Sequence, residues 1–468
     1  MKEENTTKNI LAVLAAAFMS FVGILTETSL NVTFPTMMTQ FRVSLNVVQW
    51  TTTCYLLMIA IIMICSSYLN ERFTAKQLFI WACLGFIVGS MISAFAPNFP
   101  ILLIGRLISA LGAGLSTPLM FNLVVEIMPR KKWGFYMGIA GLVVAMAPTI
   151  GPAFGGLINY YMNWRWIFII VSLLALLVFV CGIFVIGQYH EQKHNGFDYL
   201  SFLTLSGAFV CLTVGVNQIS NGIGDLLLWV LLIAAIVLFV LFVFLSKRSD
   251  KKLLDLAVFK QKAFIFGAVS YFLLQFINIG TSFVLPNYAQ IVGHQTSLVA
   301  GFLLLPGSII AGLLNPFFGR LYDSKGAKLP LYLGGILMAL GSLLLAIYGL
   351  NLTTMMIMVF YGLLMLGHRM AFSNTLAEAL KIQTGSLHAD ATAVCQTSQQ
   401  LAGSMGTTIL ASIMAIWQNK GGYSYSFLTA EGSQAAFCFT FALGIVILYS
   451  YWRMFSLEKV DVNRKNSL

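Results

Sequence analysis

Apolar residues dominate the chain in fourteen long runs, which short polar segments separate. A helix needs about 20 consecutive apolar residues to cross the hydrocarbon core of a bilayer. Each run is long enough, so the pattern predicts an all-α polytopic membrane protein with 14 transmembrane helices. The predicted spans are 10–32, 47–69, 77–96, 99–127, 133–160, 164–187, 198–219, 225–246, 263–291, 297–319, 328–349, 352–378, 389–417 and 433–455.

The composition excludes several classes of protein. Of the 468 residues, 59% are hydrophobic and 9% are charged, whereas charged residues make up about 25% of an average soluble protein. This deficit excludes a soluble multidomain enzyme, a disordered chain and a disulfide scaffold. The seven cysteines lie mostly in apolar runs without a C-x-x-C spacing, which favours reduced, hydrophobic side chains over a metal site. The sequence has no ATP-binding or catalytic motif, so we expect neither an enzyme nor a cofactor.

The 27 Lys and Arg residues predict the orientation. If both termini lie in the cytoplasm, 22 of these residues fall in cytoplasmic segments, three in outer loops and two, Arg106 and Arg369, within spans. Cytoplasmic loops carry the excess of basic residues in membrane proteins. The sequence therefore predicts a plasma-membrane protein with cytoplasmic termini, and its net charge of +11 does not indicate a nucleic-acid partner.

Two short cytoplasmic loops resemble each other. The loop after the second span contains Glu71 and Arg72, and the loop after the tenth span contains Gly319, Arg320 and Asp323. An acid beside a base in a tight loop can hold neighbouring helix ends together in one conformational state. Ordinary positive-inside turns are the alternative, but two copies at matching positions favour latches.

The repeated loops predict two six-helix sets with two helices inserted between them. The predicted divisions are an N-terminal six-helix bundle (1–190), two inserted transmembrane helices (191–246), a basic cytoplasmic linker (247–262) and a C-terminal six-helix bundle (263–468). The linker alternates charged with apolar residues, and it either lies along the inner leaflet as an interfacial helix or forms a solvated connector. Parallel six-helix repeats are how many secondary transporters build alternating access.

Over nearly its whole length the chain resembles the 14-helix drug:proton antiporter branch of the major facilitator superfamily. The motifs that carry the resemblance are Leu25–Val32 with Pro35, Gln49–Trp50, Tyr55–Leu56, Arg106–Gly114, Pro148–Pro152 with Gly155 and Gly156, Trp164–Phe168, Leu285–Tyr288, Gly301, Pro306–Gly307 and Gly319–Gly326. The resemblance implies the major facilitator fold in a 6+2+6 arrangement. It also implies export of drugs in exchange for protons that move inward. The chain departs from the family pattern at Asn70, Thr74, Ala75 and Ala147.

Glu27 is the only carboxylate well inside a predicted span. An ionised acid there costs several kcal/mol, so it must be protonated, paired or in contact with water. Ser20, Gly23 and Asn31 share its helix face, and such a polar stripe favours a central cavity over lipid. We expect Glu27 to carry the coupled proton; a structural acid near the outer headgroups is the alternative.

Arg106 lies at about the same depth as Glu27, about seven residues from the outer end of the fourth span. A guanidinium near the acid can couple conformation to protonation, because its distance sets how readily the acid ionises. The alternative is an arginine that bonds backbone carbonyls to hold its helix.

His368 and Arg369 lie inside the twelfth span, toward its cytoplasmic half. A histidine can relay protons and an arginine can hold an anionic group, whereas snorkelling to the inner headgroups is the competing explanation. The residues expected to bind substrate are Asn31, Trp50, Tyr55, Gln275, Asn278, His368, Arg369 and Asn374. Amide-mediated helix packing is the alternative for the Gln and Asn residues of this set.

Small residues and prolines mark the fifth span. Ala147, Gly151 and Gly155 recur every four residues, which permits close helix packing. Pro148 and Pro152 remove backbone hydrogen bonds and bend the helix. The segment is suited to a gate between rocking halves, and the resemblance implies a role in the direction of exchange.

The sequence thus predicts a proton-coupled antiporter that exports amphipathic drugs or toxic compounds by alternating access. Its expected partners are protons, a small amphipathic substrate and the lipid bilayer, and we expect a monomer. An exporter of a lipid or an anionic metabolite on the same scaffold and a non-transporting membrane sensor stay open as alternatives. A channel is disfavoured because two matched halves suit alternating access.

Overall fold

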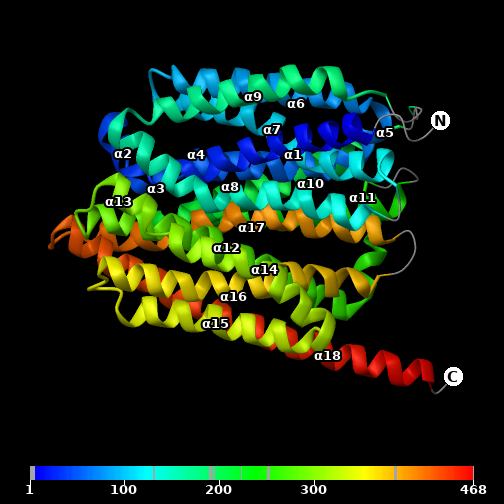
Figure 1. Cartoon of the computed structure of the whole chain (residues 1–468). Coiled ribbons are helices and arrows are strands. Elements are labelled where there is room, and N and C mark those ends of the chain that lie inside the picture. Colours follow the sequence, from blue (N-terminus) through cyan, green and yellow to red (C-terminus); the bar gives the residue numbers. More distant parts are fainter. Residues whose placement is uncertain are drawn as a thin grey trace.

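The computed structural model describes residues 6–129, 132–188, 192, 196–222, 224–249, 253–383 and 387–466. Figure 1 labels the α-helices that these residues form. Those before residue 190 are α1 (Thr6–Leu30), α2 (Phe34–Phe41), α3 (Leu45–Val48), α4 (Trp50–Ile64), α5 (Ser66–Arg72), α6 (Ala75–Ala94), α7 (Phe99–Ile127), α8 (Trp133–Tyr161) and α9 (Arg165–Val185). Those after it are α10 (Tyr199–Asn217), α11 (Leu226–Arg248), α12 (Lys262–Ile291), α13 (Ser297–Phe302), α14 (Leu305–Lys325), α15 (Lys328–Ile347), α16 (Thr354–Lys381), α17 (Leu387–Gln418) and α18 (Tyr425–Asn466).

Fourteen helical stretches in the described part of the chain are long and apolar enough to cross a membrane, which confirms the predicted number of spans. Three of them are composite: α3 and α4 form the second span, α13 and α14 form the tenth, and α10 continues as a 3-10 helix (Gln218–Asn221) in the seventh. The second span also ends earlier than its apolar run does. Cys65 leaves helical geometry (φ −94°, ψ 3°), so the last turns form the separate short helix α5.

The described part of the basic linker is only partly helical, and its placement relative to the bilayer stays a prediction. Residues 250–252 lie outside the described residues, and Leu256–Lys260 form a short 3-10 helix. Val258 is buried against Phe264 of α12 and Ala379 of α16, and its carbonyl oxygen accepts a hydrogen bond of 2.9 Å from Gln383 Nε2. This part of the linker is docked on the C-terminal helices, because Val258 finds an apolar site there.

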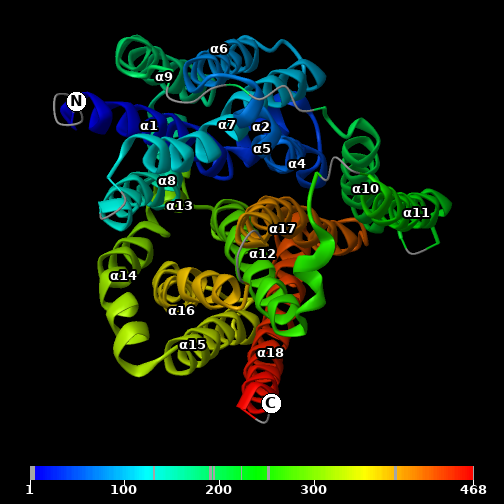
Figure 2. The ribbon, with the colours of Figure 1, turned by 90° about the vertical axis from the view of Figure 1, so that its right-hand side faces the viewer.

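The helices gather in two groups with a helix pair at one edge (Figure 2). The helices α1, α4, α6, α7, α8 and α9 pack on one another, as do α12 and α14 to α18. The inserted helices α10 and α11 pack against each other, and α10 also contacts α17. The predicted boundary at residues 190 and 191 lies outside the described residues, so the division into bundles stays a prediction.

Both described ends of the chain lie at the same end of the molecule (Figure 1), as an even number of spans requires. We call this the terminal end and the opposite one the far end. Near the far end, Thr53 of α4 approaches Thr407 and Thr408 of α17, with 3.0 Å between the hydroxyl oxygens in each pair. There, too, Asn287 Nδ2 of α12 donates to the carbonyl oxygen of Asn31 (3.2 Å).

Further contacts close the same end. The Gln290 amide of α12 donates to the carbonyl oxygen of Val32 (2.8 Å), and Ser297 donates to that of Gly156 in α8 (3.3 Å). These hydrogen bonds between the first six spans and the last six all lie in the far half. The structure is therefore closed at its far end.

Glycines let α8 approach its neighbours closely, as their four-residue spacing predicts. A side chain at Gly151 or Gly155 would collide with α1 at Thr28 or Ser29, and one at Gly156 would collide with α13 at Ser297. Pro148 and Pro152 also lie inside α8. This helix thus connects α1 to the C-terminal half by backbone contact, with no room for larger residues.

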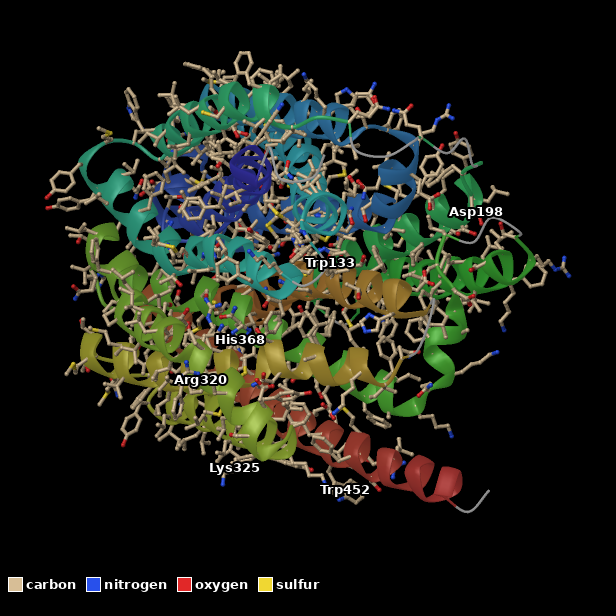
Figure 3. All side chains as sticks on the ribbon, turned by 45° about the vertical axis from the view of Figure 1, so that its right-hand side comes forward. Trp133, Asp198, Arg320, Lys325, His368 and Trp452 are labelled. Atoms are coloured by element: carbon tan, nitrogen blue, oxygen red, sulfur yellow. The ribbon has the colours of Figure 1, made fainter. Side chains whose placement is uncertain are left out.

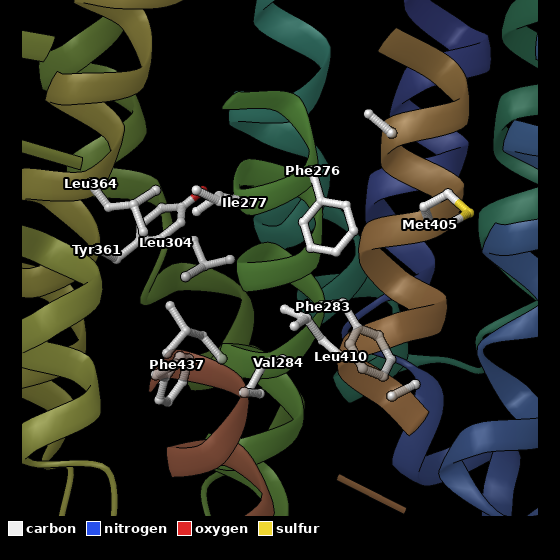
Figure 4. Packing of buried hydrophobic residues seen from close by; sticks show 14 of the residues in the cluster. Phe276, Ile277, Phe283, Val284, Leu304, Tyr361, Leu364, Met405, Leu410 and Phe437 are labelled. Carbon is white, nitrogen blue, oxygen red and sulfur yellow. The ribbon is translucent and has the colours of Figure 1, made fainter. Parts of the chain in front are cut away.

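Aromatic and aliphatic side chains fill the core of the C-terminal half. Figure 4 shows Phe276, Phe283 and Val284 of α12 between Tyr361 and Leu364 of α16 on one side and Met405 and Leu410 of α17 on the other. All of these residues are buried. This core holds the polar residues of α12 and α16 in fixed positions.

Cysteines in place of Thr53 and Thr407 should form a disulfide on oxidation, because the present hydroxyl oxygens are only 3.0 Å apart. The double variant is built in a background without the seven native cysteines, with a protease site added in the 191–195 segment. After cleavage, cross-linked halves run as one band on a gel and separate when reductant is added. The pair Thr53→Cys with Thr440→Cys is the control, because Thr440 bonds only within α18. No cross-link in the first pair would contradict closure at the far end.

Candidate functional site

Glu27 lies on α1 near the far end and is 4% exposed. Glu27 lies in the last turn of α1, three residues before Leu30, and a turn at residues 31–33 separates α1 from α2. Within the described chain, the Glu27 carboxyl makes no hydrogen bond and no ion pair shorter than 4 Å. An ionised carboxylate in such a place costs several kcal/mol.

Arg106 of α7 is fully buried beside this acid. Its Nε donates to the carbonyl oxygen of Thr51 in α4 (2.9 Å). Both terminal amino groups of its guanidinium lack a hydrogen-bond partner. The predicted alternative, an arginine that bonds a backbone carbonyl, thus describes one of its contacts and leaves most of the guanidinium unpaired.

Tyr55 joins the acid and the arginine. Its ring centroid lies 3.7 Å from the guanidinium carbon of Arg106, a distance at which the π-face attracts a cation. Its hydroxyl donates to the carbonyl oxygen of Gly23 (3.0 Å), one turn before Glu27 on α1. Glu27 and Arg106 are close enough to interact through their charges but are not in contact. The structure therefore brings Glu27, Arg106 and Tyr55 together from three helices.

Asn31 accepts hydrogen bonds at both its side chain and its backbone carbonyl. Its side-chain oxygen accepts a hydrogen bond from Thr52 (3.2 Å), and its backbone carbonyl accepts one from Asn287 (3.2 Å). Trp50 begins α4 half-buried, and the structure records no ring contact or hydrogen bond for it. The structure places Asn31 at the closure between the halves and leaves Trp50 outside the Glu27 group.

Polar residues of α12 lie along one buried face. Gln275, Asn278 and Ser282 are 9%, 8% and 8% exposed, and Ser282 lies 3.2 Å from the Tyr361 hydroxyl of α16. Asn374 of α16 donates to the carbonyl of Met370 in its own helix (2.8 Å), so part of its amide is already satisfied. Gln275 and Asn278 make no hydrogen bond to any described residue and so keep their capacity to bind a ligand.

His368 is buried in the C-terminal half (Figure 3), and both of its ring nitrogens lack a partner. Its ring stacks on Phe372 (4.8 Å between centroids), which in turn stacks on Tyr271 of α12 (4.3 Å). Arg369 follows directly, half-buried, with an Nε that is sealed and unpartnered. Both residues are 12 or more positions from the end of α16 at Lys381, or about 18 Å along the axis, which disfavours snorkelling.

The predicted latch of the second loop is open in this structure. Arg320 (Figure 3) and Asp323 of α14 are exposed, and neither forms an ion pair in the described part of the chain. In the first loop, Glu71 and Arg72 are half-buried at the end of α5. An open latch on α14 at the terminal end agrees with the closure at the far end.

Sequence reasoning missed Glu378, a second buried acid. It is 6% exposed near the terminal end of α16, where it accepts a short hydrogen bond from the Tyr322 hydroxyl of α14 and lies 3.7 Å from Lys381. It was missed because it falls at the very edge of its predicted span. The signal available was its spacing from Lys381, three residues on along the helix.

Sequence reasoning also missed Thr53, Ser404, Thr407 and Thr408, which join α4 to α17. Hydroxyl-bearing residues are common in apolar helices because they can bond their own backbone, so their pattern does not reveal a partner on another helix. No group of His, Cys, Asp and Glu that could hold a metal occurs among the described residues. Two surface cavities, of about 270 and 250 Å³, are bordered by Tyr288 and Leu352 and by Lys328 and Trp452, away from Glu27.

Tyr55→Phe should lower the free energy of unfolding by about 1 kcal/mol, the usual contribution of one hydrogen bond, because it removes the bond to Gly23 and keeps the ring. Tyr55→Leu should cost more, since the contact between the ring and Arg106 is lost as well. The measurement is the thermal midpoint of the purified protein in detergent. Equal midpoints for the two variants would show that the ring contributes nothing to holding Arg106.

Comparisons with known proteins show the family of the chain. Residues 16–407 match the sequence profile of the Major Facilitator Superfamily. Lincomycin resistance protein LmrB of Bacillus subtilis (strain 168) is 32% identical over 405 residues, which cover 85% of this chain and 84% of that protein. Multidrug resistance protein B homolog of Mycobacterium tuberculosis (strain ATCC 25618 / H37Rv) is 27% identical over 426 residues, 90% of this chain and 77% of that protein.

Among solved structures, the chain is similar to a bacterial homolog of the human lysosomal transporter Spinster in an inward-facing, unoccupied conformation. The TM-score is 0.71 with 13% sequence identity, covering 97% of this chain and 98% of that one. At this level of identity the likeness concerns the fold alone.

Proposed function

The chain belongs to the major facilitator superfamily, and we propose from this that it is a proton-coupled antiporter that exports amphipathic drugs or toxic compounds across the plasma membrane. Both termini lie in the cytoplasm in this proposal, so the structure is inward-facing, with its outer side closed. Two relatives whose names state lincomycin resistance and multidrug resistance support export of drugs. The excess of basic residues in the loops at the terminal end supports the orientation.

One observation carries the proposal: a buried carboxyl without an ion partner, Glu27, lies beside a buried guanidinium that is mostly unpaired. In this state the low-dielectric surroundings favour a neutral, protonated Glu27. The proton reaches Glu27 from outside when the outer side is open. It leaves toward the cytoplasm when water and Arg106 stabilise the carboxylate.

Conformation and protonation are coupled through Tyr55. Arg106 stacks on this ring and bonds the Thr51 carbonyl, so a movement of α4 relative to α1 changes the distance between Arg106 and Glu27. A shorter distance stabilises the carboxylate and releases the proton. Because α4 is also bonded to α17 at the far end, opening of that end moves the same helix.

We assign the roles of the remaining predicted residues from their positions in the fold. Substrate is expected at the polar face of Gln275 and Asn278, with Asn31, Trp50, Tyr55, His368, Arg369 and Asn374 around it. The gating role falls to the bend of α8 at Pro148, Gly151, Pro152 and Gly155. The latches at Glu71 and Arg72 and at Gly319, Arg320 and Asp323 close when the cytoplasmic side closes.

Glu27→Gln should abolish proton-driven export, because the amide is neutral and carries no proton across the cycle. In proteoliposomes with a pH gradient, the variant should lose uphill transport by roughly two orders of magnitude, the usual scale for removal of a proton-transfer group. Substrate counterflow without a gradient should persist, since it needs only the alternating conformations.

The control is Glu431→Gln, which removes a half-buried acid on α18 outside the site. It should leave uphill transport within about twofold, the range of an uncoupled substitution of about 0.4 kcal/mol. Uphill transport by Glu27→Gln at the rate of the unmodified protein would falsify the assignment of the proton carrier.

A further inference from the structure

The buried acidic and basic side chains in the interior of the bundle do not neutralise one another. Glu27 and Glu378 are buried acids, and Glu378 is already bonded to Tyr322 and close to Lys381. Arg106 lies in the far third of α7 and Arg369 lies in the middle of α16, and neither has an acidic partner within 4 Å in the described chain. The C-terminal half thus presents one unneutralised cation, Arg369. A buried cation without a counter-ion is expensive, and natural proteins retain one where it has a function.

We propose that Arg369 binds an acidic group of the exported compound, so that the transporter selects anionic amphiphiles over cationic ones. This inference rests on the proposed function and deepens it by naming the substrate class. The site is the guanidinium of Arg369.

The position of Arg369 excludes a role at the membrane surface. It is the sixteenth residue of α16 and 12 positions before the last, Lys381, or about 18 Å from that end of the helix. A basic side chain reaches the headgroups only from near a helix end. Its charge must therefore be stabilised inside the protein.

The face of α16 that carries Arg369 is turned away from α15. On the opposite side, Gly367 packs directly on Gly334 and Met338 of α15. An adjacent side of α16 faces α12, where the Tyr361 hydroxyl lies 3.2 Å from the Ser282 hydroxyl. At 100° per residue, Gly362 lies two turns before Arg369 on the same side of α16. Gly362 packs on Gly307 of α14.

The side chain of Arg369 is partly accessible. Its Nε is sealed and has no partner, and the residue as a whole is only half-buried. Arg369 makes no hydrogen bond to any described residue, and Tyr361 lies about two turns before it on α16. Since exposure of an arginine to lipid at this depth is costly, we place its accessible part toward the interior of the bundle.

The chemistry of the guanidinium suits an acid. An arginine binds a carboxylate, sulfonate or phosphate through two parallel hydrogen bonds. A cationic compound would instead add a third positive charge to Arg106 and Arg369. Glu27 is protonated in this proposed state. Among the described residues, no other buried carboxylate without a partner could then neutralise the charge of the cationic compound.

The test is binding of a matched pair of fluorescent probes to the purified protein in detergent without phospholipid. The probes are N-phenyl-1-naphthylamine, which is neutral, and its 8-sulfonate, which has the same rings and one negative charge; ethidium serves as the cation. The unmodified protein should bind the sulfonate roughly tenfold tighter than the neutral parent, equivalent to about 1.4 kcal/mol. Ethidium should bind more weakly than both.

Arg369→Gln should reduce this tenfold preference to about one, and Arg369→Lys should restore part of it, because a lysine keeps the charge without the bidentate geometry. Arg453→Gln is the matched control, since Arg453 lies on α18 beside Trp452 and Phe266, and the preference should persist in it. Size-exclusion profiles and thermal midpoints verify that each variant is folded. An unchanged preference in folded Arg369→Gln, or ethidium binding as tight as that of the sulfonate, would overturn the inference.

An acidic drug and a lipid phosphate offer the same chemistry, and competition separates them. Short-chain phosphatidylglycerol and an aromatic carboxylate are each titrated against the bound sulfonate, and the stronger competitor identifies the source. Proton-driven transport of ethidium in proteoliposomes, unaffected by Arg369→Gln, would refute acid recognition and leave the proposed function standing. Absence of proton-driven transport for all three probes would refute the proposed function itself.

Discussion

The contact between Arg106 and Tyr55, with an unpaired Glu27 one turn from the tyrosine hydroxyl, is the interaction on which the rest of the site depends. Neither charge is neutralised by a direct partner in this state, although both are buried. In water such groups would be satisfied at no cost, but in the interior of a membrane protein each must be protonated, paired or wet. Any change in the packing of α1, α4 and α7 therefore changes the stability of the Glu27 carboxylate.

The closure at the far end is built from contacts that are individually weak. Hydroxyl and amide hydrogen bonds join α4 to α17 and α1 to α12, and glycines let α8 meet α13 without side chains between them. Each such bond contributes about 1 kcal/mol. A set of weak bonds can be broken by binding energy of similar size, as a transporter that alternates between two states requires. At the terminal end, by contrast, Arg320 and Asp323 form no ion pair in the described part of the chain.

Much of the architecture is predictable from the residues alone, for identifiable reasons. The number of spans follows from the length of the apolar runs, and the placement of both ends on one side follows from its being even. The close packing of α8 follows from the spacing of Gly151 and Gly155. The candidate site is predictable in part: Glu27, Arg106 and Tyr55 do meet, but Trp50 lies apart from them and Asn374 is partly satisfied by its own helix. Glu378 was missed because sequence patterns locate a span boundary only to within a few residues.

Residue types alone establish the class of protein, the spans and the scarcity of interior charge, because the cost of moving each residue type into hydrocarbon depends on the residue alone. The tertiary structure decided which groups meet: that Tyr55 lies under Arg106, that Glu378 is bonded to Tyr322, that the linker docks through Val258, and that the far end is the closed one. These are contacts between helices distant in sequence. Helical periodicity specifies which residues share a face, but the choice of neighbour for that face depends on how all the helices pack.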